Sequence, residues 1–229
     1  MEKYGQVPKK FTKEWWEWLW EYYKLHICVT LVVLFATGLT IYQVKTKIHY
    51  DLYITYMGTS MPIEGQTSAI EAEWNSILPD VNGNGKTEVF FQTMTDLGEN
   101  ASSVLGGQSV EYTAAIETKK TVELQMGESF VFIISKHQMD TWYAHGLTDD
   151  VFVPSDVWLS NKDVEKAPDT AVNCFVKLPE GNPLEKNGFA ADEELYIAVR
   201  SIRDNEDEDE VKKIQQAAFT AADYAVNGR

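Results

Sequence analysis

Small and polar residues follow two apolar stretches of the chain, at positions where a ligand could bind. Gly58, Thr59 and Ser60 come directly after the first stretch. Ser135 and His137 come at the end of a later one. If both stretches are strands of an α/β sheet, these residues lie beyond the carboxyl ends of the strands, where such sheets bind their ligands. The pattern predicts hydrogen-bonding groups for a small solute at that edge.

Two aromatic residues follow the second of these stretches. Trp142 and Tyr143 could stack on a ligand at the same edge. Their helical spacing from Met139 is equally typical of side chains buried in a core. Both interpretations stay open at this point.

A polar turn is the one candidate for a metal site. Asp80, Asn82 and Asn84 place oxygen ligands at positions one, three and five of a calcium loop, and a Gly follows at position six. Position twelve, however, is Phe91, where such a loop needs a bidentate Glu. A turn built from two Asn-Gly pairs accounts for the same residues.

Other chemical motifs are missing or weak. His137, Asp140 and His145 lie close together in the sequence and could be considered as metal ligands. They share a helix face only loosely, however, as expected of a solvated surface. The chain has no GxSxG, GxxxxGK[ST] or HExxH motif, so it predicts no catalytic residue and no cofactor, and we expect a protein that is not an enzyme. Residues 100–102 match a glycosylation sequon, which is a weak signal.

The charge of the chain limits its partners, and its cysteine content limits how it can be stabilised. Residues 49–229 carry 13 Lys and Arg against 31 Asp and Glu, a net charge of −18. Such an acidic surface repels phosphate backbones, which argues against nucleic-acid binding. Because Cys174 is the one cysteine beyond Cys28, no intramolecular disulfide can stabilise this part of the chain, which must depend on its own core.

The apolar segment at residues 25–44 predicts a transmembrane helix. Twenty residues without a formal charge rise about 30 Å, the thickness of the hydrocarbon core of a bilayer. Five Lys precede this segment and two follow it, which predicts a cytoplasmic N-terminus and an extracellular C-terminal domain in the cell membrane. A cleaved signal peptide and a buried helix of a soluble protein are the alternatives.

Aromatic residues are concentrated immediately before this segment. Trp and Tyr favour the headgroup layer of a bilayer, so they predict a membrane-interface collar. So many Trp side chains could also form a docking face for another membrane protein. The collar residues are Trp15, Trp16, Trp18, Trp20, Tyr22 and Tyr23.

The rest of the chain alternates between strand and helix patterns. Strands are predicted over residues 51–58, 87–94, 129–135, 171–177 and 194–200, and helices over 68–78, 109–126, 136–145 and from about 205 onward. This alternation predicts an α/β layered domain with a largely parallel sheet. The expected divisions are a tail and interfacial helix (1–24), the transmembrane helix (25–44), a linker (45–50) and the α/β domain (51–229).

Several stretches together resemble the membrane-anchored, extracytoplasmic solute-binding-like proteins of Gram-positive bacteria. They are residues 21–27, 79–87, 122–135 and 194–200. Within the third stretch, residues 124–134 resemble a helix, a turn with Gly and an acid, and an apolar strand of type 2 solute-binding proteins. The resemblance implies a non-enzymatic binding or accessory protein, with one lobe and an abbreviated second. Its partners would be the lipid bilayer and a small solute or another envelope protein. The alternative is a structural subunit of an envelope or transporter complex, docked through the Trp-rich helix.

Overall fold

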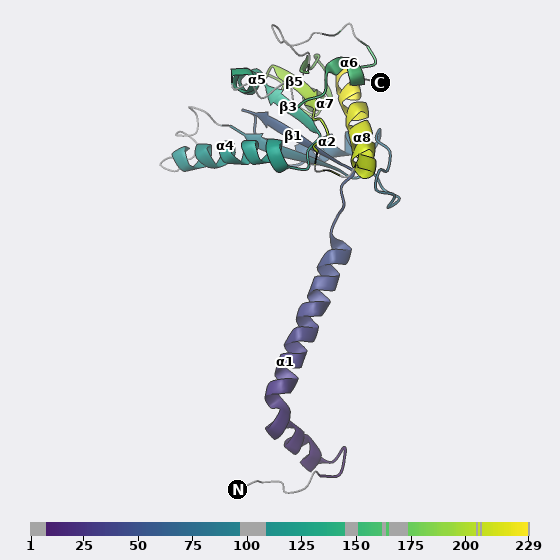
Figure 1. The fold of residues 1–229 in the computed structure, drawn as a ribbon. Coiled ribbons are helices and arrows are strands. Elements are labelled where there is room, and N and C mark those ends of the chain that lie inside the picture. The colour runs from purple at the N-terminus through teal and green to yellow at the C-terminus, as the bar shows by residue number, and fades with distance from the viewer. Residues whose placement is uncertain are drawn as a thin grey trace. The chain divides into compact units, whose positions relative to one another are not determined.

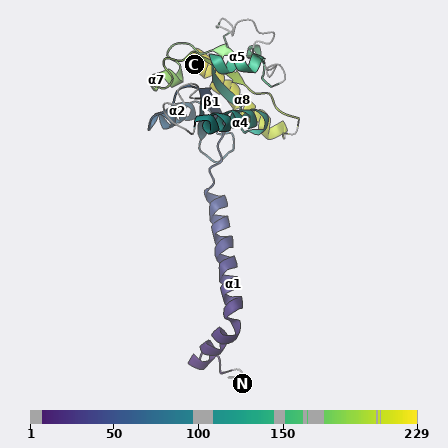
Figure 2. The ribbon, with the colours of Figure 1, turned by 90° about the vertical axis from the view of Figure 1, so that its left-hand side faces the viewer.

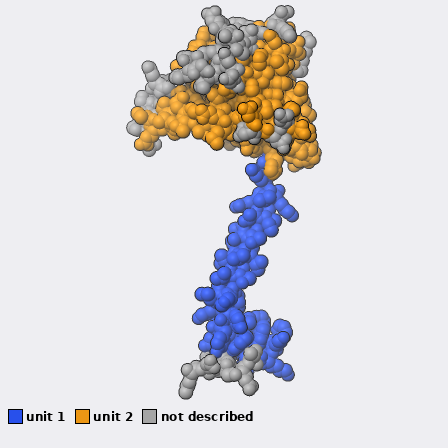
Figure 3. Space-filling view, in the orientation of Figure 1, with its two compact units in different colours: residues 1–48 blue, residues 49–229 orange. Residues whose placement is uncertain are grey.

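The computed structural model describes residues 8–96, 109–144, 151–161, 164, 174–204, 206 and 208–228. The chain divides into two compact units, residues 1–48 and residues 49–229 (Figure 3). The boundary between them falls inside the predicted linker, residues 45–50. Predicted features at residues 100–102, His145 and residues 171–173 lie outside the described residues.

The first unit is a single helix, α1 (Lys13–Thr46). The Thr12 hydroxyl caps it by accepting the Trp15 N–H at 3.3 Å, as Thr does at helix starts. The helix runs without interruption through the predicted division at residue 25, so the aromatic collar and the apolar segment form one rod of about 50 Å. It is long and apolar enough to cross a membrane, and none of its residues is buried.

The second unit is built on a five-stranded sheet of order β2-β1-β3-β5-β4 (Figures 1 and 2). Its strands are β1 (Leu52–Gly58), β2 (Val89–Thr95), β3 (Val131–Ser135), β4 (Val176–Lys177) and β5 (Leu195–Val199). β1 pairs in parallel with both β2 and β3, whereas β5 pairs antiparallel with both β3 and β4. β5 therefore runs against the other four strands.

The prediction of a largely parallel sheet is therefore only partly right, because the sheet is mixed. The continuous apolar run of β3 predicts a central parallel strand that is covered on both faces. The residues of β3 are buried on both faces, but burial makes a strand apolar whatever the direction of its neighbours. Strand direction depends instead on the connection between β4 and β5, which returns the chain beside the strand it has just left.

Helices cover both faces of the sheet. They are α2 (Gln66–Asn75), α4 (Ser109–Met126), α5 (Lys136–Ala144), α6 (Ser155–Trp158), α7 (Pro183–Lys186) and α8 (Glu208–Asn227). One core cluster joins the sheet to α2, α6, α7 and α8, and a second joins its other face to α4 and α5. Figure 1 shows α8 on one side of the strands and α4 and α5 on the other. The domain is an α/β sandwich of three layers, as the alternation of elements predicts.

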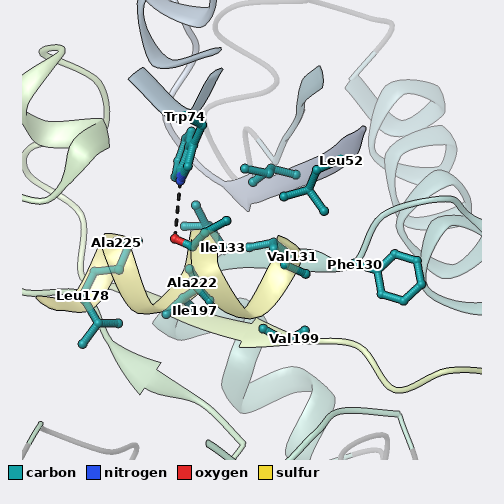
Figure 4. Packing of buried hydrophobic residues seen from close by; sticks show 14 of the residues in the cluster. Leu52, Trp74, Phe130, Val131, Ile133, Leu178, Ile197, Val199, Ala222 and Ala225 are labelled. Atoms are coloured by element: carbon teal, nitrogen blue, oxygen red, sulfur yellow. Dashed lines mark hydrogen bonds between the residues drawn. The ribbon is translucent and has the colours of Figure 1, made fainter. Parts of the chain in front are cut away.

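The first core cluster centres on Trp74 of α2. Its indole N–H donates to the carbonyl oxygen of Ala221 on α8 at 3.4 Å, and its ring stacks on Phe91 of β2 at 6.0 Å between centroids. Figure 4 shows Trp74 pointing toward α8, whose Ala222 and Ala225 lie close to the sheet. The small alanine side chains let the backbone of α8 approach β1 and β3. Trp74 then contacts both α8 and the sheet, so it connects α2 to both of them.

The start of α2 differs from its prediction. Ser68 and Glu71 have the spacing of a capping box, which predicts a helix start at Ser68. The helix instead begins at Gln66, and its N-cap is Gly65, in the left-handed region at φ 85°. No side chain caps this helix; the Gln66 side chain instead holds its first residue in place by accepting the N–H of Ile63 at 2.9 Å and donating to the Gly188 carbonyl at 2.7 Å. The helix therefore starts one turn earlier by using a contact distant in sequence.

Helix α4 has its predicted bounds but turns an unexpected face to the core. Ala115, Val122 and Met126 belong to the apolar set that predicts this helix, yet all three are exposed. Lys120 lies on the buried face together with Leu124 and is 3% exposed. Its ammonium donates to Asp96 at 3.2 Å and to Glu117 and Gln138 at 2.7 Å. These three partners satisfy the buried charge, which would otherwise carry a large desolvation cost.

We expect Trp74→Ala to destabilise the second unit by about 3–5 kcal/mol, because it leaves a cavity between α2, α8 and the sheet. Urea unfolding of the full chain in detergent, followed by the fluorescence of the remaining Trp residues, would measure the loss. Val157→Ala on α6 is the control, since Val157 is 62% exposed and should change stability by less than about 0.5 kcal/mol. Equal effects of the two substitutions would contradict this packing.

Candidate functional site

The carboxyl end of β1 forms a hydrogen-bonded network with Glu193. One carboxylate oxygen of Glu193 accepts the Thr59 N–H at 2.9 Å. The other accepts the Ser60 hydroxyl at 3.0 Å and the Tyr56 hydroxyl. Glu193 lies just before β5, and because β5 is antiparallel, its start lies at the same edge as the end of β1. The structure thus brings the predicted residues Thr59 and Ser60 onto an acid that the sequence analysis did not select.

Gly58 is required at this junction by the space that the network occupies. A Cβ at Gly58 would clash with both the Tyr56 hydroxyl and the Glu193 carboxylate. The buried position raises the pKa of the Tyr56 phenol above its ordinary value of 10.0, and the hydrogen bond to Glu193 raises it further. Gly58 therefore has a steric role here: it lets the strand pass beside a buried phenol and a carboxylate.

A second acid, Glu194, connects β4, β5 and the start of α5. Its carboxylate lies 3.2 Å from Lys177 and 3.9 Å from Lys136. The Tyr196 hydroxyl also donates to it at 2.9 Å. The Tyr196 bond and Lys177 together hold the pKa of Glu194 below its ordinary value. Glu194 is thus an ionised, paired carboxylate beside the Glu193 network.

The other predicted ligand contacts have different positions. Ser135 is buried, and its hydroxyl accepts the Gln138 N–H at 3.3 Å, so it caps α5 as its spacing predicts. His137 is exposed on α5. Trp142 is 5% exposed and stacks on Phe152 at 5.6 Å inside the second core cluster, which supports the core interpretation of this residue. Gly58, Thr59 and Ser60 therefore lie together beside Glu193, whereas Trp142 lies in the core of the domain.

The candidate calcium loop is a closed polar turn. Both carboxylate oxygens of Asp80 accept backbone N–H groups, at 2.7 Å from Gly83 and 2.7 Å from Gly85. The side-chain oxygens of Asn82 and Asn84 likewise accept N–H groups inside the loop, at 3.0 and 2.8 Å. The oxygens proposed as metal ligands thus stabilise the turn itself, as in the Asn-Gly alternative.

A pocket of about 420 Å³ opens beside the two acids of the sheet edge. Its volume lies in the range typical of small-molecule sites, about 300–1,000 Å³. Five of its lining residues are acidic and one is basic, which leaves a strongly negative lining. The residues are Lys177, Leu178, Pro179, Glu180, Asn182, Glu185, Ala190, Ala191, Asp192, Glu193, Glu194 and Leu195.

The acidic pocket could not be predicted from the sequence, because its residues belong to a connecting segment that carries no recognisable pattern. Residues 178–194 carry no motif, and their position depends on the direction of β5. One signal was present: two adjacent acids, Glu193 and Glu194, come directly before a strong strand. Had β5 been predicted to be antiparallel, those acids would have been placed at the ligand-binding edge.

In the first unit, the aromatic collar lies on the surface of α1. Trp16 and Trp20 are more than half exposed, whereas Trp15 and Trp18 are partly covered by neighbouring rings. Trp15 packs against Trp16 at 4.9 Å, and Trp18 lies 5.8 Å from Tyr22 and 5.5 Å from Tyr23. Most of the collar side chains thus contact one another on the surface of the helix.

The sequence matches no protein-family model, and no curated protein or solved structure shows significant similarity to it. Function must therefore be argued from the pocket and the helix themselves.

We expect Glu193→Gln to lower stability at pH 7 by about 1–3 kcal/mol, because a charged acceptor of three hydrogen bonds is lost. The deficit should shrink above pH 10. The pKa of Tyr56 is raised in the folded state, so its contribution to stability is complete below pH 10 and is lost as pH rises through the folded pKa. Since Glu193 helps to raise that pKa, the variant should lose less stability there than the native chain.

Chemical denaturation at pH 7 and at several values above 10 would measure both effects. Glu180→Gln is the matched control, because Glu180 lines the same pocket but is not bonded to Tyr56. A deficit for Glu193→Gln that stays constant with pH would contradict the coupling of Tyr56 to Glu193.

Proposed function

We propose that this protein is a membrane-anchored, non-enzymatic binding or accessory protein whose α/β domain holds a small organic cation in the acidic pocket at the carboxyl edge of its sheet. The observation that carries this proposal is the lining of the pocket, where acids outnumber bases five to one. The resemblance to extracytoplasmic solute-binding-like proteins points to the same class of function. The described residues form one sheet, and the proposed site lies at its edge rather than between two lobes.

The charge distribution favours a cationic ligand. Lys177 is paired with Glu194, so its charge is already compensated within the protein. The negative potential of Glu180, Glu185, Asp192 and Glu193 therefore dominates the pocket. A pocket lined by one sign of charge concentrates ligands of the opposite sign. A small amine could pair with these carboxylates through charge-assisted hydrogen bonds.

The arrangement of the acids favours an organic cation over a metal ion. Within the described residues, no group of three or more His, Cys, Asp or Glu side chains could hold a metal ion. The acids of the pocket are instead spread over a loop from Glu180 to Glu194. Separated carboxylates suit a ligand with extended or multiple positive groups, such as a diamine or oligoamine.

The membrane anchor forms the second part of the proposal. The length and composition of α1 suit a membrane span. The Lys bias of the flanking residues supports a cytoplasmic N-terminus, which places the binding domain outside the cell. An anchored domain of this kind would capture its ligand at the cell surface.

We expect an oligoamine such as spermidine to raise the melting temperature of the full chain in detergent. At about 100 times its Kd, a ligand specific for the folded state adds about 2.7 kcal/mol, a rise of roughly 5–10 °C for a chain of this size. A thermal-shift series of oligoamines, amino acids, sugars and calcium would measure the effect. The absence of any shift at millimolar oligoamine would count against the proposal.

Variants connect that shift to the pocket. Glu180→Gln and Asp192→Asn should each reduce it, because both acids line the pocket and are exposed. Glu210→Gln on α8 removes the same charge from an exposed residue outside the pocket and should leave the shift unchanged. Equal reductions in all three variants would indicate nonspecific binding to the acidic surface.

We expect a cysteine at Val157 to react with a membrane-impermeant maleimide on intact cells, because Val157 is exposed and belongs to the external domain in this topology. A cysteine at Lys10 should react only after lysis. Both variants would carry Cys28→Ala, and Cys174 is buried and unreactive. The reverse labelling pattern would overturn the topology.

The exposed aromatic surface of α1 supports a second candidate, a structural subunit of an envelope or transporter complex. Trp16 and Trp20 present more aromatic surface than anchoring alone needs. Crosslinking in a mild detergent would detect a stable partner. A monomer that binds an oligoamine would favour the first function over this one.

A further inference from the structure

The face of α4 that points away from the core carries exposed apolar side chains beside the charged residues Glu111 and Lys119. Val122 is 51% exposed and Met126 is 78% exposed, and Ala115 lies at the same side of the helix. The large side chains on a solvated helix face are usually polar. The apolar pattern that predicted this helix is real, but it lies on the surface, whereas Lys120 occupies the core. The packing of the domain therefore does not explain why these apolar side chains lie on its surface.

A half-buried aromatic cluster lies next to the carboxyl end of α4. Tyr50, Tyr53 and Phe90 contact one another with ring centroids 5.0–5.6 Å apart. The segment after α4 reaches this cluster, because the Phe130 N–H donates to the Tyr53 carbonyl at 3.3 Å. Burial and a hydrogen bond to Glu128 together raise the pKa of the Tyr53 phenol to about 12. The carboxyl end of α4, where Met126 lies, is thus close in the chain to residues that contact the aromatic cluster.

Both features lie where the chain enters the second unit. The carboxyl end of α4 lies toward the start of β1, because Glu128, just after α4, is hydrogen-bonded to Tyr53. The start of α4 lies at the other end of the strands, where the Tyr112 hydroxyl donates to the Thr95 carbonyl at 2.9 Å. Five residues separate the end of α1 at Thr46 from the start of β1 at Leu52. A fully extended chain of this length spans only about 20 Å. If α1 crosses a membrane, this tether keeps the start of β1 close to the membrane surface.

We propose that the surface formed by Val122, Met126, Tyr50, Tyr53 and Phe90, here called the α4 surface, rests on the headgroup layer of the bilayer. Tyr suits this layer because its ring is apolar and its hydroxyl stays hydrated. Val and Met add apolar area without charge. The inference depends on the proposed membrane span of α1, and it extends that proposal from an anchored domain to a domain held in one orientation.

The α4 surface would contact lipid rather than a second copy of the chain or another protein. The tether brings lipid to this side of the domain in every molecule, whatever its concentration. The surface also contains no cluster of basic residues, so the contact would rely on apolar and aromatic groups. It should therefore form on neutral phosphatidylcholine.

The test uses the full chain in phosphatidylcholine nanodiscs, with Cys28→Ala to remove the reactive native thiol. Single cysteines at Met126, Val157 and Phe35 would each carry an NBD fluorophore. Lipids with a nitroxide near the headgroup then quench a fluorophore at the membrane surface, which is measured at positions 126 and 157. Lipids with a nitroxide deep in the acyl chain quench a fluorophore inside the membrane span, which is measured at position 35. Val157 is the matched control, because it is also apolar and 62% exposed but lies on α6. Phe35 lies within α1 and reports on the membrane span itself.

We expect strong quenching at positions 126 and 35 and little at 157. Quenching at 35 without quenching at 126 would overturn the docking of the α4 surface and leave the span intact. Equal quenching at 126 and 157 would also overturn it, since the domain would then have no preferred orientation. A fluorophore at 126 that is shielded from water but not quenched would indicate a second copy instead. An absence of quenching at 35 would contradict the membrane span and this inference together.

Discussion

The domain depends on covering both faces of its three central strands. The residues of β3 and β5 are all buried, and β1 is buried except at Tyr53. No disulfide or bound metal is needed to explain how such a sheet is held, because it is covered by α2 and α8 on one face and by α4 and α5 on the other. A sheet covered in this way leaves its edges as the places where polar groups can gather, and the acidic pocket lies at one of them.

Covering the sheet also explains the buried charges. The second face meets a helix whose sequence supplies Lys120 where an apolar residue would be expected. The domain accommodates this residue by surrounding its ammonium with Asp96, Glu117 and Gln138. These three partners come from the end of β2, from α4 and from α5, so the charge joins separate elements. A buried ion pair adds little net stability. Its consequence is instead a fixed orientation of α4, which leaves Val122 and Met126 outside.

The sequence predicts the elements better than their mutual arrangement. The apolar run of β3, the alternation of strands and helices and the Ser135 cap are local patterns, and the structure confirms each of them. The direction of β5 and the start of α2 are decided by contacts between distant residues, such as Gln66 with Gly188. The same is true of the candidate site. Thr59 and Ser60 could be predicted from the end of a strand, whereas Glu193 lies more than 130 residues away and enters the site through the topology alone.

The two ends of the sheet differ in chemistry, and in the function proposed above this difference would separate anchoring from binding. The chain enters at the start of β1, beside the aromatic residues Tyr50, Tyr53 and Phe90. The carboxylates of Glu193 and Glu194 lie beyond the opposite end of the same strands. A strand of seven residues is roughly 23 Å long, so the pocket is separated from the point of attachment by most of the domain. An acidic pocket at the attachment end would face the headgroups of the bilayer and its phosphates. At the far end of the strands, its negative potential can act on solutes in the surrounding water.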